Sequence, residues 1–199
     1  MKENPLIIVV VGPTASGKSD FAVELAQNSN GEVISADSRQ LYKGLDIGTG
    51  KIRVDEMKSI PHHMLSVYDL DEDISVARYM KDASPILLDI IARGKTPIVC
   101  GGTGQYIDSL IYTTMTPPVP PDHKLREELE KKSADELYDE LLKKDSIRAI
   151  AIDRHNRVRL IRALEIVATL GMVPQAQKEE LRYPTKLYLM NPTRALLRE

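Results

Sequence analysis

An apolar run, a glycine-rich loop and an amphipathic segment follow one another near the start of the chain. Residues 6–11 are apolar and mostly β-branched, which is typical of a buried parallel strand, and residues 20–27 have helical spacing. Between them, the sequence Gly12-Pro13-Thr14-Ala15-Ser16-Gly17-Lys18-Ser19 fits the pattern Gly, four residues, Gly, Lys, and Ser or Thr. Glycines let backbone N–H groups approach phosphate oxygens, and a helix N-terminus adds positive potential. The sequence therefore predicts an α/β fold with a phosphate site between its first strand and first helix.

Two side chains of this loop have chemistry that suits a bound phosphate. Lys18 can neutralise phosphate charge, and the Ser19 hydroxyl can ligate Mg²⁺. A chance match in a loop rich in glycine and serine is the alternative, but the strand before it and the helix after it favour a phosphate site. The loop alone does not identify the phosphate compound, and nucleotides such as ATP are only the commonest ligands.

Length and composition restrict the class of protein. The chain has 199 residues, 42% of them hydrophobic, and a formal net charge of -2, which suits one domain with an inserted subdomain. No apolar run reaches the roughly 18 residues of a membrane span, and residues 1–5 lead directly into the first strand. We therefore expect neither a membrane span nor a signal peptide. Because Cys100 is the single cysteine, an internal disulfide is excluded, and we expect a packed core thiol in a cytoplasmic protein.

The character of the sequence changes near residue 113. Short apolar strands alternate with helices before it, and a proline-rich segment at residues 116–121 reads as an extended linker. The helices expected after this linker span residues 122–132, 133–144 and 145–170. We predict a P-loop NTPase-like parallel sheet flanked by helices, formed by residues 1–112 and 185–199, with a helical insertion at residues 113–184.

Capping residues and apolar runs mark individual elements. Ser75 is predicted to cap a helix that continues to Arg93, and Ser133 with Glu136 forms a predicted capping box. Residues 63–67 are predicted to form a third strand.

Three segments follow predicted strands and should therefore meet at the carboxyl edge of the sheet. They are residues 12–19, 36–40 and 101–104. Asp37 would lie near the phosphate, where a carboxylate can hold Mg²⁺ through water or take a proton from a nucleophile. A turn or capping role is the alternative for Asp37. Thr103 could donate its hydroxyl to a phosphate oxygen, or could be a turn residue.

Two charged features are ambiguous from the residues alone. Residues 148–162 contain five arginines and one acid, Asp153, but at helical spacing these arginines do not share one face. A solvated helix surface is the simpler interpretation. His62 and His63 could suggest a metal site, but adjacent strand residues point to opposite faces, so we reject this interpretation.

Six segments occur along the chain in one order: residues 12–19 (GPTASGKS), 34–42 (ISADSRQLY), 44–49 (GLDIGT), 61–65 (PHHML), 101–107 (GGTGQYI) and 159–165 (RLIRALE). In this order they resemble the tRNA dimethylallyltransferase family, whose members prenylate an adenosine beside the anticodon. One segment alone would be a weak signal, whereas six in sequence are specific and cover nearly the whole chain.

The resemblance implies transfer of a dimethylallyl group from dimethylallyl diphosphate to N6 of the adenosine adjacent to the anticodon in tRNA, with Mg²⁺ as the cofactor. It implies that Asp37 is the general base, that Lys18 stabilises the leaving diphosphate and that Thr103 lies near the reacting groups. The residues implied to hold the diphosphate are Gly12, Pro13, Thr14, Ala15, Ser16, Gly17, Lys18 and Ser19, with Ser19 also on the metal ion. The residues implied to face the anticodon stem-loop are Asp37, Ser38, Arg39, Gln40, Thr103, Arg126, Arg159 and Arg162.

The chain departs from the family in length and at several positions. Members of the family continue well beyond the position of Glu199. We expect a monomer, or a chain that a further C-terminal segment completes. The substituted positions are Gly50, Ile52, Ser66, Gln105 and Ser146. Two other functions stay open: a small-molecule P-loop kinase, with Asp69 as its nearest acidic residue for Mg²⁺, and an inactive remnant that binds RNA or diphosphate.

Overall fold

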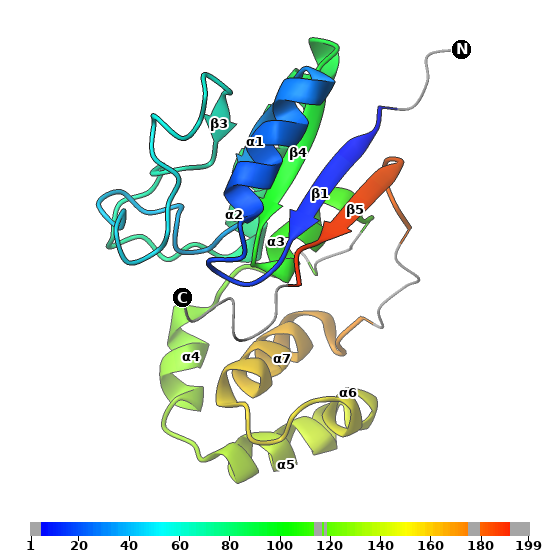
Figure 1. Ribbon diagram of the computed structural model, residues 1–199. Helices are drawn as coiled ribbons and strands as arrows, with labels where there is room; N and C mark the ends of the chain where they lie inside the picture. Colours follow the sequence, from blue (N-terminus) through cyan, green and yellow to red (C-terminus); the bar gives the residue numbers. More distant parts are fainter. Residues whose placement is uncertain (1–4, 114–116, 118, 175–179, 192–199) are drawn as a thin grey trace. The chain divides into compact units, whose positions relative to one another are not determined.

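The computed structural model describes residues 5–113, 117, 119–174 and 180–191. Its contacts divide the chain into two units, Met1–Thr114 with Glu179–Glu199 and Met115–Lys178 (Figure 1). Part of the predicted linker, residues 116 and 118, lies outside the described residues.

The first unit is built on a parallel sheet of five strands in the order β3-β2-β4-β1-β5. The strands are β1 (Ile7–Val11), β2 (Gly31–Ser35), β3 (His62–His63), β4 (Thr96–Gly101) and β5 (Thr185–Leu189). Strands β1 and β4 are apolar and buried almost throughout, as expected for strands covered on both faces. The predicted parallel α/β sheet is confirmed.

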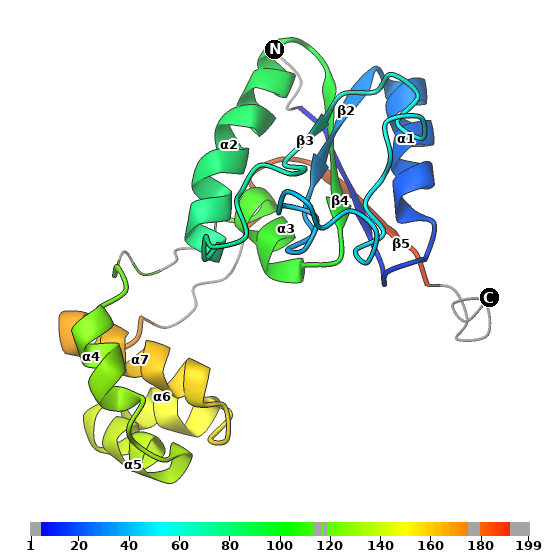
Figure 2. The ribbon, with the colours of Figure 1, turned by 90° about the vertical axis from the view of Figure 1, so that its left-hand side faces the viewer.

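Helices cover the two faces of this sheet (Figure 2). Helix α1 (Lys18–Ser29) packs on one face, whereas α2 (Val76–Ala92) and α3 (Gly104–Ile111) pack on the other. The α1 face has a core of Ile8, Val10, Ala22, Ala26, Val33, Ile98 and Cys100. Ser75 caps α2 as predicted, since its side chain accepts a hydrogen bond from the Arg78 N–H at 3.2 Å. Alternate residues of β1, β2 and β4 therefore fill two separate cores.

The predicted strand at residues 63–67 is wrong in its extent. Strand β3 contains only His62 and His63, because Met64 and Ser66 have φ angles of 57° and 52° and leave the extended conformation. The backbone N–H of Ser66 instead donates to the Gln40 carbonyl at 3.1 Å. The segment therefore turns back over the loop that follows β2.

The two adjacent histidines engage different partners. Nδ1 of His62 donates to the Ile60 carbonyl at 2.9 Å, whereas Nε2 of His63 lies 2.8 Å from Oε2 of Glu32. The Glu32 side chain is 3% exposed and also accepts hydrogen bonds from Arg93 and Lys95. The Arg93 hydrogen bonds are the main reason that the pKa of Glu32 lies well below its usual range, and Lys95 and His63 add to them against the effect of burial. This cluster ties β3 to β2 and to the start of β4.

The second unit consists of helices around a leucine-rich core. They are α4 (His123–Leu129), α5 (Ala134–Lys144), α6 (Ser146–Ala151) and α7 (Arg157–Leu170). The predicted capping box of Ser133 and Glu136 is confirmed at the start of α5. The single helix predicted at residues 145–170 is wrong. Because Asn156 accepts a hydrogen bond from the Arg159 N–H at 3.1 Å, it starts a separate helix, α7.

A glycine at the end of β4 fixes how closely two strand ends approach. A Cβ added to Gly101 would lie 2.2 Å from the Ala36 carbonyl oxygen, a backbone atom that cannot rotate away. Gly101→Ala should therefore push the end of β2 outward and lower the free energy of unfolding by about 1–3 kcal/mol. Urea denaturation measures this loss. Gly104→Ala is the matched control, because its added Cβ meets nothing within 4 Å; equal effects of the two changes would contradict the prediction.

Candidate active site

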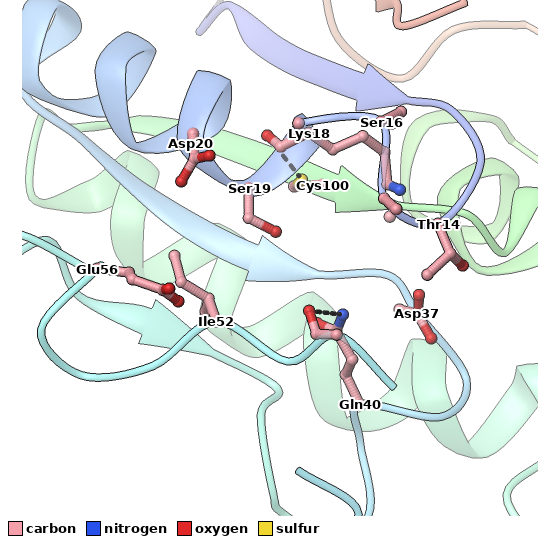
Figure 3. A pocket seen from close by; sticks show the side chains of 14 residues that line it. Thr14, Ser16, Lys18, Ser19, Asp20, Asp37, Gln40, Ile52, Glu56 and Cys100 are labelled. Carbon is pink, nitrogen blue, oxygen red and sulfur yellow. Dashed lines mark hydrogen bonds between the residues drawn. The ribbon is translucent and has the colours of Figure 1, made fainter. Parts of the chain in front are cut away.

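Residues 12–19 form the loop between β1 and α1, which we call the phosphate loop. A cavity of about 240 Å³ lies where this loop faces the segment after β2 (Figure 3). Its walls come from four segments of the first unit, residues 14–20, 37–40, 50–56 and 100–101. The lining residues are Thr14, Ala15, Ser16, Gly17, Lys18, Ser19, Asp20, Asp37, Gln40, Gly50, Ile52, Glu56, Cys100 and Gly101. The structure therefore brings together the loop, Asp37 and the end of β4, as the carboxyl-edge argument predicts. We call this cavity the donor pocket.

The backbone of the loop is arranged for close approach to an anion. Gly17 has a φ of 77° and immediately precedes α1, so the unpaired N–H groups of the first helical turn are available. Gly12 has no room for a side chain, since a Cβ there would lie 2.5 Å from the Met190 carbonyl oxygen. The Ser16 hydroxyl is buried and has no hydrogen-bond partner among the described residues. These features suit a loop that binds phosphate oxygens.

The side chain of Lys18 extends toward the start of the loop. Its Nζ donates a hydrogen bond to the Pro13 carbonyl, which holds the ammonium group beside the pocket. Burial lowers the pKa of Lys18, while the neighbouring Cys100 and Asp37 act in the opposite direction. A bound anion would add a charge partner to a lysine that is already partly desolvated.

Asp37 makes a turn contact and still faces the donor pocket. Its Oδ1 accepts a hydrogen bond from the Arg39 N–H at 3.0 Å, which is an Asx-turn, so the turn interpretation is correct. No partner of Oδ2 is found within the part of the chain that the structure describes. The turn therefore orients the carboxylate and leaves one oxygen for other chemistry (Figure 3).

Thr103, which follows β4, holds this turn through two hydrogen bonds. Its Oγ1 accepts a hydrogen bond from the Ser38 N–H at 3.0 Å, and its own N–H donates to the Ala36 carbonyl at 3.0 Å. Thr103 is not among the residues that line the donor pocket. Its contacts hold the Asp37 segment in position, and its expected contact with the diphosphate or the target nucleotide stays a prediction.

Part of the pocket wall comes from a segment whose sequence does not predict a buried position. Residues 51–58 look like a polar surface segment, yet Ile52 is 7% exposed and lines the pocket together with Glu56. Lys51 holds this segment, because its Nζ donates to the Tyr42 carbonyl, to Asp46 and to Ser66 at 2.7–2.8 Å. The apolar residues of this segment, Ile52, Val54 and Met57, alternate with charged ones, and this pattern does not show that Ile52 is the buried one.

Cys100 is a core thiol, as predicted. Its side chain is buried, and Sγ lies 3.6 Å from the Lys18 carbonyl oxygen. Burial raises the pKa of Cys100 to about 12, so the thiol is protonated near neutral pH and is a poor nucleophile.

Two arginines predicted to face tRNA share a buried carboxylate in the second unit. Arg126 donates to both carboxylate oxygens of Glu165, at 2.7 and 3.0 Å, and Arg162 lies 3.3 Å from Oε2. The Glu165 side chain is fully buried, and burial opposes its ionisation. The hydrogen bonds from Arg126, the Asp122 N–H and Arg162 outweigh this effect and lower the pKa of Glu165. Arg126 and Arg162 therefore have an internal charge partner, whereas Arg159 is exposed.

Other predicted residues lie on surfaces of the first unit. Ser38 and Arg39 are exposed directly after Asp37, and Gln40 donates to the Thr49 and Gly50 carbonyls at 3.3 and 3.2 Å. Asp69 is exposed, pairs with Lys43 at 3.0 Å and does not line the donor pocket. This position does not favour the kinase alternative.

Within the described residues, no three or more His, Cys, Asp or Glu side chains form a group that could hold a metal ion. Nor does any helix in the described ranges have the length and apolar character needed to cross a membrane.

Curated proteins similar to this chain include two tRNA dimethylallyltransferases. A tRNA dimethylallyltransferase of Anoxybacillus flavithermus is 44% identical over 185 residues, which cover 91% of this chain and 60% of the relative. A tRNA dimethylallyltransferase of Bacillus licheniformis is 40% identical over 204 residues, covering 98% and 65%. The chain thus spans less than two thirds of the length of these relatives.

Solved structures and a family model give the same result. The full-length tRNA isopentenylpyrophosphate transferase of Bacillus halodurans is similar with a TM-score of 0.57 and 41% identity, over 85% of this chain and 57% of that one. A eukaryotic dimethylallyltransferase acting on tRNA is similar with a TM-score of 0.80 and 32% identity, over 94% and 48%. The family model described as IPP transferase matches residues 40–199. The chain therefore belongs to the IPP transferase family.

Proposed function

We propose that this chain transfers a dimethylallyl group from dimethylallyl diphosphate to N6 of the adenosine adjacent to the anticodon in tRNA. The observation that carries the proposal is that the phosphate loop and the Asp37 carboxylate line one cavity. Such a cavity holds a leaving diphosphate beside a group that can accept a proton, which a group transfer to an amine requires.

Residues 12–19 would bind the diphosphate of the donor. Backbone N–H groups of the loop and of the first turn of α1 would contact its oxygens, and Lys18 would neutralise part of its charge. The Ser19 hydroxyl and the Asp37 carboxylate line the pocket and are oxygen donors, the kind of ligand that Mg²⁺ prefers. When bound, the ion would neutralise charge on the departing diphosphate. Because Mg²⁺ keeps several waters and phosphate ligands, one or two of these side chains suffice.

Asp37 would act as the general base. The exocyclic amine of adenine is a weak nucleophile, because its lone pair is delocalised into the ring. As the N6–C1 bond forms, the C1–O bond to diphosphate breaks, and Asp37 takes the proton from N6. Lys18 and the loop N–H groups would stabilise the charge that develops on the leaving oxygen.

The substrate adenosine would reach this site unstacked from the anticodon loop. Ser38, Arg39 and Gln40 follow the proposed base directly and would contact the target nucleotide, supported by Thr103. The basic side chains of the second unit, Arg126, Arg159 and Arg162, would face the RNA backbone, where each phosphate contact adds salt-dependent affinity. A tRNA substrate implies a cytoplasmic enzyme, and we propose that it acts as a monomer.

Donor binding and transfer test the proposal separately. Dimethylallyl diphosphate with Mg²⁺ should bind in calorimetry, and Lys18→Met should weaken this binding about 10- to 100-fold, since a hydrogen bond to a charged group contributes about 1.5–3 kcal/mol. Lys43→Met, which changes an exposed lysine that pairs with Asp69, is the control and should leave binding unchanged. Mass spectrometry of digested tRNA should detect the prenylated adenosine.

Two results would overturn the proposal. Tight binding of ATP with no response to the prenyl donor would favour a small-molecule kinase. Binding of both tRNA and donor without any prenylated product would identify a chain that binds its ligands but does not catalyse the reaction.

A further inference from the structure

A second cavity, of about 20 Å³, shares four lining residues with the donor pocket. We call it the inner cavity. Its walls are Ser19, Val33, Ser35, Gln40, Ile52, His62, Leu65 and Cys100. A cavity must have a volume of roughly 10–15 Å³ to hold one water molecule. The inner cavity therefore has room for one water and for no larger ligand.

Two buried polar atoms in the inner cavity lack partners. Ser35 Oγ and His62 Nε2 make no hydrogen bond to any of the described residues, and Ser35 is only 4% exposed. Native proteins rarely leave such atoms unpaired, because their lost hydration is then uncompensated. Both residues line the inner cavity, which has room for one water.

The strand register explains why these atoms share one cavity. Val33 pairs with His62, and Ser35 pairs with Cys100, in parallel ladders. Side chains of paired residues point to the same face, and residues two apart on β2 share that face. Ser35, His62 and Cys100 therefore lie on the α1 face of the sheet, where Ser19 at the start of α1 also lines the cavity.

The tautomer of His62 defines the chemistry of the missing partner. Nδ1 lies 2.9 Å from the Ile60 carbonyl oxygen, which can only accept, so Nδ1 carries the hydrogen. Burial lowers the pKa of His62 and so favours the neutral ring. Nε2 of that tautomer is an acceptor, and the group opposite it must donate.

We propose that the inner cavity binds one water molecule, which donates a hydrogen bond to His62 Nε2 and accepts hydrogen bonds from the hydroxyls of Ser35 and Ser19. This gives the water three polar partners, the usual number for a buried water. Ser19 gains a defined orientation. A hydroxyl that gives a lone pair to Mg²⁺ must donate its hydrogen elsewhere, and the water in the inner cavity accepts it. The contact to Ser19 rests on the proposed function, whereas the contacts to Ser35 and His62 do not.

Crystals grown with EDTA test for the water itself. At high resolution, density should appear within about 2.7–3.2 Å of both Ser35 Oγ and His62 Nε2. Ser35→Val fills the cavity and should remove this density. Absence of density in the unchanged protein, or its persistence in Ser35→Val, would overturn the inference. Density that appears only with Mg²⁺ would assign the water to the hydration shell of the ion and would overturn a resident water.

Binding of inorganic diphosphate tests the link to Ser19. With Mg²⁺, Ser35→Val should weaken binding about tenfold, at the low end of losses from groups that orient a metal ligand. With EDTA, the affinity should be unchanged. Ser35→Ala is a smaller change and should give a smaller loss of diphosphate affinity with the same dependence on Mg²⁺. If Ser35→Val fails to fold, Ser35→Ala is the variant to measure.

The matched control is Ser109→Ala, because Ser109 is equally buried but donates to the Tyr106 carbonyl at 2.7 Å, away from both cavities. It should leave diphosphate binding unchanged. Equal Mg²⁺-dependent affinities for the Ser35 variants and the unchanged protein would overturn the link to Ser19. Prenyl transfer is not measured in either experiment, so their failure is distinct from failure of the proposed function.

Discussion

Asp37→Asn should lower the rate of prenyl transfer about 10²–10⁴-fold, the range associated with loss of a general base. The amide cannot take the N6 proton, but its oxygen can still accept the hydrogen bond from the Arg39 N–H that holds the turn. The geometry of the segment is therefore retained while the proton acceptor is lost. Single-turnover rates with saturating donor and tRNA measure the effect.

Binding separates this chemical loss from a structural one. The affinity for dimethylallyl diphosphate should change little in Asp37→Asn, because in the proposed function the loop and Lys18 would supply most of the contacts to the donor. Asp69→Asn is the control for the loss of a carboxylate outside the pocket and should keep the full rate. If Asp37→Asn transferred the prenyl group as fast as the unchanged chain, Asp37 would not be the base.

Glu165→Gln should lower the free energy of unfolding of the second unit by about 3 kcal/mol. This is the lower end of the cost of breaking a buried ion pair, because the Arg126 and Arg162 side chains are about one third exposed and can turn toward water. Hydrogen exchange of the Leu160 and Leu164 amides in α7 reports the stability of this unit separately from that of the sheet.

Arg126 binds the Glu165 carboxylate and Arg159 is exposed, so we expect a structural role for Arg126 and an RNA-binding role for Arg159. Arg126→Gln should reduce the protection of α7 amides, because it removes two hydrogen bonds to Glu165. Arg159→Gln should leave that protection unchanged and reduce only the affinity for tRNA, with a shallower dependence on salt. If Glu165→Gln and Arg126→Gln both left α7 as stable as before, the ion pair would not be structural.

Local signals in the sequence were sufficient for several elements. The run before Gly12 and the helix after Ser19 were identified because strand and helix periods are properties of neighbouring residues. Ser133 and Glu136 were identified as a capping box for the same reason. Asp37 was placed beside the loop by the rule that parallel strands end at one edge of a sheet.

Contacts between distant residues were not accessible in this way. Asn156 can cap a helix, but the apolar spacing on both sides of it indicated one continuous helix. In the sequence, Glu165 follows an apolar run and resembles a surface residue. Its burial depends on Arg126, which belongs to another helix and donates a hydrogen bond to it. Ile52 lines the donor pocket in a segment that Lys51 holds through three distant partners.

The sequence by itself determined that the chain has a phosphate loop between a strand and a helix, and which acidic residue would face it. The tertiary structure decided the strand order, the short β3, the inner cavity at Ser35 and His62, and the burial of Glu165. The physical reason is that backbone conformation and capping depend on residues a few positions apart. Burial and ion pairing depend instead on which distant side chains exclude water from one another.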